Sequence, residues 1–199
     1  MGDRSAAGDA DPPRRVRADA QRNIEAVVDA ATAVFAESGV DAPVREIASR
    51  AGVGVGTLYR HFPQRSDLIV AVFQKEIDAC AGAADRLGTT YEPDEALARW
   101  LRRYTTLIAT KRGLAAALHS GDSAFDSLPG YFDQRMEPAL RSLLDAAATA
   151  GKIRADVAPG DLLRAVGNLC MPADAESSGH ADRMVNLLLD GLRYRSAGD

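Results

Sequence analysis

Residues 44–62 read VREIASRAGVGVGTLYRHF, and they decide the fold. Two helices that cross closely need a small residue at the crossing, which Ala48 supplies, and a turn residue that tolerates positive φ, which Gly52 supplies. The apolar positions that tie the two helices together are Ile47, Ala51, Val53 and Leu58. The second helix must present short and polar side chains, and the residues suited to this are Gly56, Thr57, Tyr59, Arg60 and His61. The combination predicts a helix-turn-helix.

Basic charge is concentrated around this motif. The whole chain has a formal net charge of -4, yet residues 43–65 carry four arginines and a single acidic residue, Glu46. From Ser66 onward the acidic residues outnumber the basic ones, 19 to 15. A chance cluster of arginines explains a segment of this charge equally well, so the charge supports the motif without deciding the function.

A first helix is expected before the motif, from about Asp19 to Ser38. Its apolar residues recur at helical spacing, and they are Ile24, Val27, Val28, Ala31, Val34 and Phe35. Gly39 then offers a left-handed stop, Pro43 opens the second helix, and a third helix is expected over 55–61. Residues 1–18 are interpreted as a disordered basic arm, which leaves residues 19–65 as a three-helix domain.

The remainder, residues 66–199, has the character of a second helical domain. Ser66 and Asp67 are placed to cap a long helix that runs to about Leu87. Further helices are predicted from the apolar spacing over residues 93–118, 131–150, 161–170 and 180–194, with loops over 120–129 and 172–179. No stretch alternates long enough to be a convincing strand. The predicted fold class is all-α, a helix-turn-helix domain followed by a C-terminal helical bundle.

Other chemistries lack the context that they require. The GVGVG run follows no strand and has Thr57 where a dinucleotide-binding loop needs its third glycine. The HSGDS segment at 119–123 lacks the strand and the nucleophile elbow of a hydrolase. The three histidines are His61, His119 and His180, and they have no paired spacing for a metal. No catalytic residue, metal site or cofactor is expected.

The composition favours a location in the cytoplasm. No apolar run approaches the ~20 residues that cross a bilayer, and the N-terminal stretch MGDRSAAGDADPPRRVRADAQ has no apolar core for a secretory signal. The two cysteines, Cys80 and Cys170, are far apart and form no disulfide framework. These features favour a cytoplasmic protein without a membrane partner.

The run from Gln21 to Ala79 resembles the N-terminal domain of TetR-family regulators, most clearly in GVGVGTLYRHF followed by PQRSDL. The resemblance covers about a third of the chain, and the later helices match the family only in number and character. It implies a sequence-specific, DNA-binding transcriptional regulator that is not an enzyme. It further implies a homodimeric repressor that a small-molecule ligand releases from DNA.

The resemblance also implies which residues contact DNA. Arg45 would reach bases or phosphates, and Thr57 and Tyr59 would bind phosphates. Arg65 would clamp a phosphate at the start of the fourth helix, and Arg22 matches basic residues used near the first helix. The residues implied to face the major groove are Val55, Gly56, Arg60 and His61.

This sequence departs from the common family pattern near the motif. Pro43 stands where many members carry a Ser or Thr that contacts phosphate, and Gly54 stands where Ser is frequent. Residues 55–56 offer no hydrogen-bonding side chain. Base readout is therefore expected to depend mainly on Arg60, Arg45 and the shape of the DNA.

Two further sites are expected in the bundle. The chain's only tryptophan and most C-terminal aromatics lie between positions 100 and 136, which predicts an effector pocket for a small apolar or aromatic ligand. The expected pocket residues are Trp100, Tyr104, Leu107, Phe125, Phe132 and Met136, with His119, Arg103 or Cys170 as the orienting polar contact. The family's last two helices form a two-fold dimer interface, expected here to include Leu162, Val166, Leu169, Met184, Leu188 and Leu192.

The expected partners are thus a palindromic double-stranded DNA operator, a second copy of the chain and an unidentified small-molecule effector. The alternative is an all-α enzyme or a helical partner-binding protein whose motif is incidental. That alternative would need an acid–base or metal constellation in the C-terminal part, and none is visible in the sequence.

Overall fold

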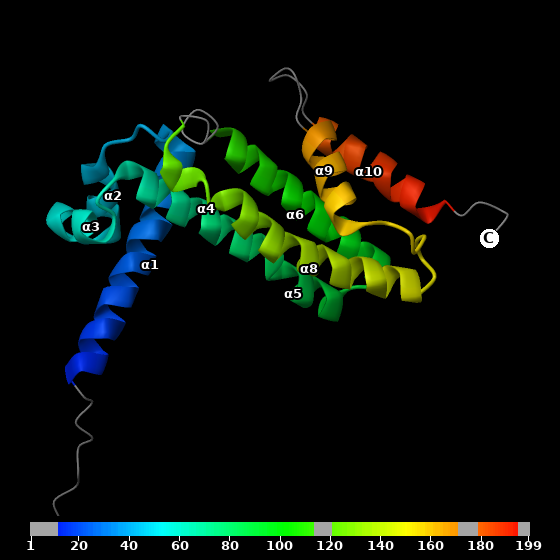
Figure 1. Ribbon diagram of the computed structural model, residues 1–199, viewed down its shortest axis with the longest axis horizontal. Coiled ribbons are helices and arrows are strands. Elements are labelled where there is room, and N and C mark those ends of the chain that lie inside the picture. Colours follow the sequence, from blue (N-terminus) through cyan, green and yellow to red (C-terminus); the bar gives the residue numbers. More distant parts are fainter. Residues whose placement is uncertain (1–11, 114–120, 171–178, 195–199) are drawn as a thin grey trace, which may run out of the picture. The chain divides into compact units, whose positions relative to one another are not determined.

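The computed structural model describes residues 12–113, 121–170 and 179–194. Every regular element in these ranges is a helix, so the expected all-α class is confirmed (Figure 1). The chain divides into two compact units, residues 1–68 and residues 69–199. Within the described ranges, none of the helices has an apolar stretch long enough to span a membrane.

The first unit contains α1 (Pro12–Ser38), α2 (Val44–Ala51), α3 (Val55–His61) and the first residues of α4 (Arg65–Ala81). Helix α1 packs against α2 and α3, which also contact each other. Of the residues predicted to form and tie the crossing, Ile47, Ala48 and Leu58 are almost fully buried, whereas Ala51 and Val53 are half-buried. The hydrophobic face of α1 therefore supports the two short helices that follow it.

Two glycines end helices in the way the sequence predicts. Gly39 has a φ of 78° and Gly52 a φ of 69°, both in the left-handed region that side chains disfavour. After α2, the backbone N–H of Gly52 donates to Ser49 at 3.2 Å, and that of Val53 donates to Ala48 at 3.0 Å. These bonds satisfy the last carbonyls of α2 and direct the chain into α3.

The start of α1 differs from the expectation of a disordered arm over residues 1–18. The structure places residues 12–18 in α1, and residues 1–11 lie outside the described ranges. The physical reason is that Pro12 and Pro13 occupy the first turn, where a missing N–H removes no helical hydrogen bond. The polar sequence RRVRADA that follows contains good helix formers and continues the same helix.

The second unit is a bundle around α6 (Pro93–Gly113). This helix contacts α5 (Ala83–Thr90), α8 (Leu128–Thr149), α9 (Pro159–Leu169) and α10 (His180–Arg193) (Figure 1). A short 3-10 helix, η1 (Ser123–Phe125), precedes α8. The core residues of the bundle come from all of these helices and include Leu97, Leu101, Leu140, Val166 and Val185.

The prediction of one continuous helix over residues 66–87 is wrong. Helix α4 ends at Ala81 and α5 begins at Ala83, with Gly82 between them. Glycine is unfavourable in the interior of a helix, because its backbone loses the most conformational freedom on folding.

Helix α8 begins earlier than expected, at Leu128, with Pro129 in its first turn. The helix expected over 93–118 is described only as far as Gly113.

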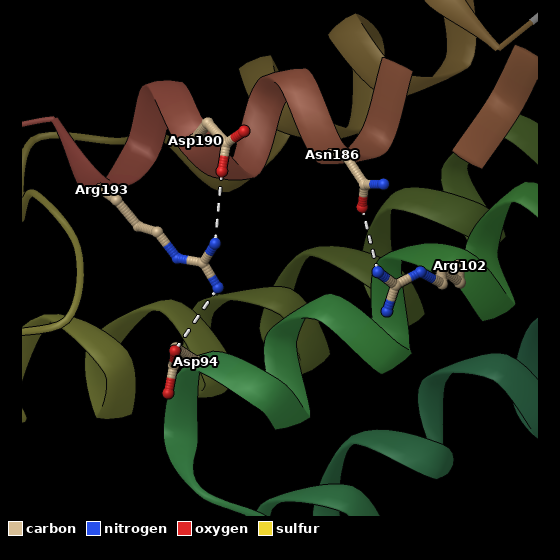
Figure 2. Close-up of polar contacts among 5 residues, drawn as sticks. All are labelled: Asp94, Arg102, Asn186, Asp190 and Arg193. Carbon is tan, nitrogen blue, oxygen red and sulfur yellow. Dashed lines mark hydrogen bonds and ion pairs between the residues drawn. The ribbon is translucent and has the colours of Figure 1, made fainter. Parts of the chain in front are cut away.

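Polar side chains join α6 to α10 at two places (Figure 2). The guanidinium of Arg102 donates to Oδ1 of Asn186 at 3.0 Å. Arg193 lies 3.5 Å from Asp94 on α6 and 3.3 Å from Asp190 on its own helix. These polar contacts are at least partly exposed and contribute little stability, and they accompany the burial of Val185, Leu189 and Leu192 on α10.

Candidate DNA-binding surface and effector site

Helix α3 exposes most of its surface. Leu58 is its one buried residue, and the side chains beside it face outward. Tyr59 is 48% exposed, Arg60 and Gly56 are also exposed, and Thr57 is half-buried. Val55 and His61 are half-buried as well. The residues predicted to contact DNA on α3 therefore share one short helix held by a single leucine.

Arg45 and Arg50 of α2 have different environments. Arg45 is exposed at the beginning of the helix. Arg50 donates both terminal nitrogens to the carboxylate of Glu37, at 2.7 and 2.8 Å. The hydrogen bond from Arg50 holds the pKa of Glu37 below its ordinary value. Glu37 thus neutralises one of the four local arginines, and no sequence spacing indicated this pair.

Arg65 has an intramolecular role that the sequence did not reveal. Its guanidinium donates to the backbone carbonyl of Val40, and to that of Ala42 at 2.7 Å. It therefore joins the first turn of α4 to the loop between α1 and α2. A phosphate contact for Arg65 stays a prediction and would have to use the remaining N–H groups of its guanidinium.

Two other polar residues of the first unit have intramolecular partners. Asp67 accepts a hydrogen bond from the backbone N–H of Gln64 at 2.8 Å and so caps the beginning of α4. Arg22 is exposed on α1 and forms an ion pair with Asp19. This ion pair does not test the predicted DNA contact of Arg22. Because the pair is exposed and weak, a phosphate of DNA could replace Asp19 as the partner of Arg22.

Three of the four aromatic residues of the predicted pocket form a packed cluster. The indole N–H of Trp100 donates to the carbonyl of Cys80 at 3.0 Å, and the phenol of Tyr104 donates to the carbonyl of Leu163 at 3.3 Å. The rings of Trp100 and Tyr104 stack with centroids 6.0 Å apart, and the ring of Phe132 lies 6.0 Å from that of Tyr104. Both polar groups of the cluster are thus satisfied by the protein itself.

The predicted pocket residues consequently have the environment of a core. Trp100 and Met136 are 0% exposed. Tyr104, Leu107 and Phe125 are buried, and Phe132 is half-buried. His119, one of the suggested polar contacts, lies outside the described residues. Occupation of this cluster by a ligand would require its members to separate.

A hollow of about 350 Å³ lies beside this cluster, between α4 and α6. Its lining residues are Glu76, Cys80, Arg102, Arg103, Thr106 and Leu107. Leu107 belongs to the predicted pocket set, and Arg103 is one of the three polar contacts suggested for it. Burial raises the pKa of the Cys80 thiol to about 12, so this group is a neutral, apolar part of the lining at physiological pH.

The residues predicted for the dimer interface fall into two groups. Leu162, Val166 and Leu192 are buried in the chain's own core, and their contact with a second copy stays a prediction. Met184 and Leu188 are half-buried and Leu169 is 41% exposed. Sequence reasoning missed two exposed apolar residues of this region, Leu187 and Tyr194, which are 63% and 69% exposed.

A buried helix crossing, a glycine turn and an exposed second helix define a class of protein, the helix-turn-helix DNA-binding regulators. A family model described as bacterial regulatory proteins of the tetR family matches residues 27–72. A second model, for the C-terminal domain of SbtR-like transcriptional regulators, matches residues 92–194, about half of the chain. The chain belongs to the TetR family of transcriptional regulators.

Solved structures and curated proteins agree with this assignment. A TetR transcriptional regulator of Streptomyces coelicolor is 35% identical, with 87% of this chain and 99% of that chain covered and a TM-score of 0.72. A TetR regulatory protein of Mycobacterium vanbaalenii is also 35% identical, with coverages of 90% and 99% and a TM-score of 0.70. An HTH-type transcriptional regulator of Staphylococcus aureus USA300 is 41% identical over 64 residues, which span 32% of this chain and only 35% of that relative.

Proposed function

We propose that this chain is a homodimeric repressor that binds a palindromic operator in the cytoplasm and leaves it when a small molecule binds residues 66–199. The observation that carries the proposal is the outward face of α3, where Tyr59 and Arg60 are exposed around the buried Leu58. Residues 19–65 would contact DNA. The family is one of transcriptional regulators, which are generally not enzymes.

The contacts of α3 and α2 with DNA divide into two kinds. Arg60, exposed on α3, reads base edges in the major groove, because an arginine can donate two hydrogen bonds to guanine. Thr57 and Tyr59 hold phosphates through their hydroxyl groups, and Arg45 adds a cation beside them. Since Gly56 has no side chain, the groove in front of it is read by its shape.

The test is an electrophoretic mobility-shift assay on DNA upstream of the chain's own gene, followed by a salt titration. Arg60→Ala should reduce discrimination between the operator and single-base variants by ~1–3 kcal/mol. Arg45→Ala should weaken binding to all sequences alike and reduce the salt dependence. Arg141→Ala, at an exposed position of α8, is the matched control and should change neither quantity. If Arg60→Ala discriminates as the parent does, Arg60 has no role in base readout.

The dimer forms through an apolar stripe along α10. Met184, Leu187 and Leu188 follow one another at helical spacing, and the exposed Tyr194 directly follows Arg193, the last residue of the helix. Leu169 at the end of α9 is also exposed, and its carbonyl lies 2.8 Å from Nε2 of His180 at the start of α10. An exposed apolar stripe of this kind supports an interface with a second copy, and two copies would place two α3 helices at successive half-sites.

Light scattering of Leu187→Glu tests this interface. A glutamate buried against a second copy loses its hydration, so the dimer dissociation constant should rise by at least about thirtyfold. Gln134→Glu on the exposed face of α8 adds the same charge away from the stripe and should remain dimeric. A parent chain that is monomeric at micromolar concentration, or a Leu187→Glu variant that remains fully dimeric, contradicts the proposed interface.

A further inference from the structure

The hollow between α4 and α6 has a floor and a rim of different character. Its floor is apolar and buried, since Cys80 is 2% and Leu107 is 4% exposed. Its rim is polar, with Glu76 contributed by α4 and Arg103 by α6. A volume of about 350 Å³ lies within the range of sites for small molecules.

Two of the three ionic side chains of the rim, Glu76 and Arg103, have opposite charges and form no ion pair with each other. In the part of the chain that the structure describes, neither Glu76 nor Arg103 has an ion pair or a side-chain hydrogen bond. Arg102, the other cation of the rim, differs from Arg103 in that one of its terminal nitrogens donates to Asn186 of α10 (Figure 2). A negative and a positive group from two adjacent helices therefore lie at the same hollow, each with its hydrogen-bonding capacity available.

The chemical complement of this arrangement is a small molecule with both charges and an apolar tail. We propose that the hollow binds an α-amino-acid-like zwitterion, with its carboxylate on Arg103, its ammonium group on Glu76 and its side chain over Leu107 and Cys80. Arginine forms two parallel hydrogen bonds to a carboxylate, which orients the ligand. The role of this ligand as the effector rests on the function proposed above, whereas the site itself does not.

Trp100 offers an internal reporter for this site. Its indole N–H donates to the carbonyl of Cys80, a residue of the hollow's lining. Because it is the only tryptophan of the chain, any ligand that displaces the backbone at Cys80 changes a single fluorescence signal.

The first experiment titrates the full chain with L-leucine, L-methionine and L-phenylalanine, followed by Trp100 fluorescence and by calorimetry. The matched probes for leucine are 4-methylpentanoate, which lacks the amine, and 3-methylbutylamine, which lacks the carboxylate. At least one amino acid should bind, and its analogues without one charge should bind about tenfold more weakly or worse, because each loses a charged hydrogen bond. If none of the three amino acids binds, or if an analogue binds as well as its parent, the proposal is wrong.

The second experiment locates the binding. Arg103→Gln and Glu76→Gln keep the size of the side chain and remove its charge, and each should weaken the amino acid about tenfold or more. Glu76→Gln should leave the weaker binding of 4-methylpentanoate unchanged. The controls Arg141→Gln and Glu92→Gln, at exposed positions outside the hollow, should bind like the parent. Full affinity in both hollow variants would place the ligand elsewhere and overturn the assignment.

A mobility-shift assay with the bound amino acid separates the two proposals. Calorimetric binding that depends on Glu76 and Arg103 upholds the site, whether or not the operator is released. Binding that leaves the operator complex intact counts against this ligand as the effector, not against the hollow. Absence of operator binding by the unliganded chain would contradict the repressor function while the calorimetry still decides the site.

Discussion

Helices α3 and α8 use their residues in opposite ways. Helix α3 has seven residues and buries Leu58 alone. Helix α8 has 22 residues, and those that it buries are Leu128, Met136, Leu140, Leu143, Leu144 and Ala147. An isolated helix as short as α3 is not stable in water. Helix α3 is therefore held in place by its neighbours in the first unit and presents a surface, whereas α8 stabilises the bundle by its own buried face.

The largest effect is expected from removing the main aromatic of the bundle. Trp100→Ala should lower the free energy of unfolding by about 3–5 kcal/mol, because it leaves a cavity and an unpaired carbonyl at Cys80. Urea denaturation followed by circular dichroism measures it, since the fluorescent group is lost. Trp100→Phe keeps most of the volume and should cost clearly less. Equal losses in the two variants would show that the hydrogen bond, not the packing, dominates.

The next effect tests the dependence of α3 on one residue. Leu58→Ala should lower stability by about 2–5 kcal/mol and abolish operator binding, because α3 loses its buried contact. Its neighbour Tyr59→Ala should change stability by less than about 0.5 kcal/mol and still weaken operator binding. Denaturation and mobility-shift assays on the pair measure both quantities. If the Leu58→Ala variant binds the operator like the parent, then α3 does not depend on its single buried residue, and the contrast with α8 is wrong.

A smaller loss is expected at the loop between α1 and α2. Arg65→Ala removes two hydrogen bonds from a charged donor to the carbonyls of Val40 and Ala42, and should lower stability by about 1.5–3 kcal/mol. Arg65→Lys keeps the charge but lacks the planar guanidinium that donates to two carbonyls at once, so it should recover only part of the lost stability. Salt titration of operator binding then separates the structural role from a phosphate contact. A stability like the parent's in Arg65→Ala would show that the loop does not depend on it.

The smallest effect concerns pH and the bundle alone. Burial raises the pKa of Cys80 to about 12, while an unfolded cysteine ionises near about 8.5. The folded chain thus keeps a proton that the unfolded chain loses, so stability is complete below about pH 8.5 and falls above it by up to about 1.4 kcal/mol per pH unit. Burial also raises the pKa of Tyr104, which adds to the decline above about pH 10.

Thermal or urea denaturation between pH 7 and 10.5 measures this slope. Cys80→Ala removes the ionisable group and should give a flatter decline, whereas Cys170→Ala, with a less deeply buried thiol, should change the slope less. Identical slopes in the parent and in Cys80→Ala would mean that this thiol ionises equally in both states.

The sequence predicts the first unit better than the second for a physical reason. The helix crossing at Ala48 and the turn at Gly52 need particular residue types, so their identities can be recognised along the chain. In α10, apolar residues occur on more than one face. Periodicity therefore cannot distinguish Leu192, which packs in the chain's own core, from Leu187, which faces outward.

Contacts between distant residues were also beyond prediction. The bond from Trp100 to the carbonyl of Cys80 joins positions 20 apart, and the pair of Arg50 with Glu37 joins positions 13 apart on different helices. Nothing in local spacing marks such pairs. The expected apolar effector site likewise followed from where aromatics cluster in the sequence, and that clustering is equally the signature of a filled core.

Replacing Gly52 and replacing Gly56 would have different effects on stability, although a Cβ at either position would meet no atom within 4 Å. At position 52 the backbone has a φ of 69°, so most side chains would cost about 1–2 kcal/mol whatever the space. At position 56 the backbone is helical, and alanine would even favour α3 by about 1 kcal/mol. Under mutation and selection, position 52 is therefore constrained by the fold, while position 56 can acquire a serine or an asparagine without loss of stability. With α3 in the major groove as proposed above, regulators descended from this chain would change their operators most readily at position 56.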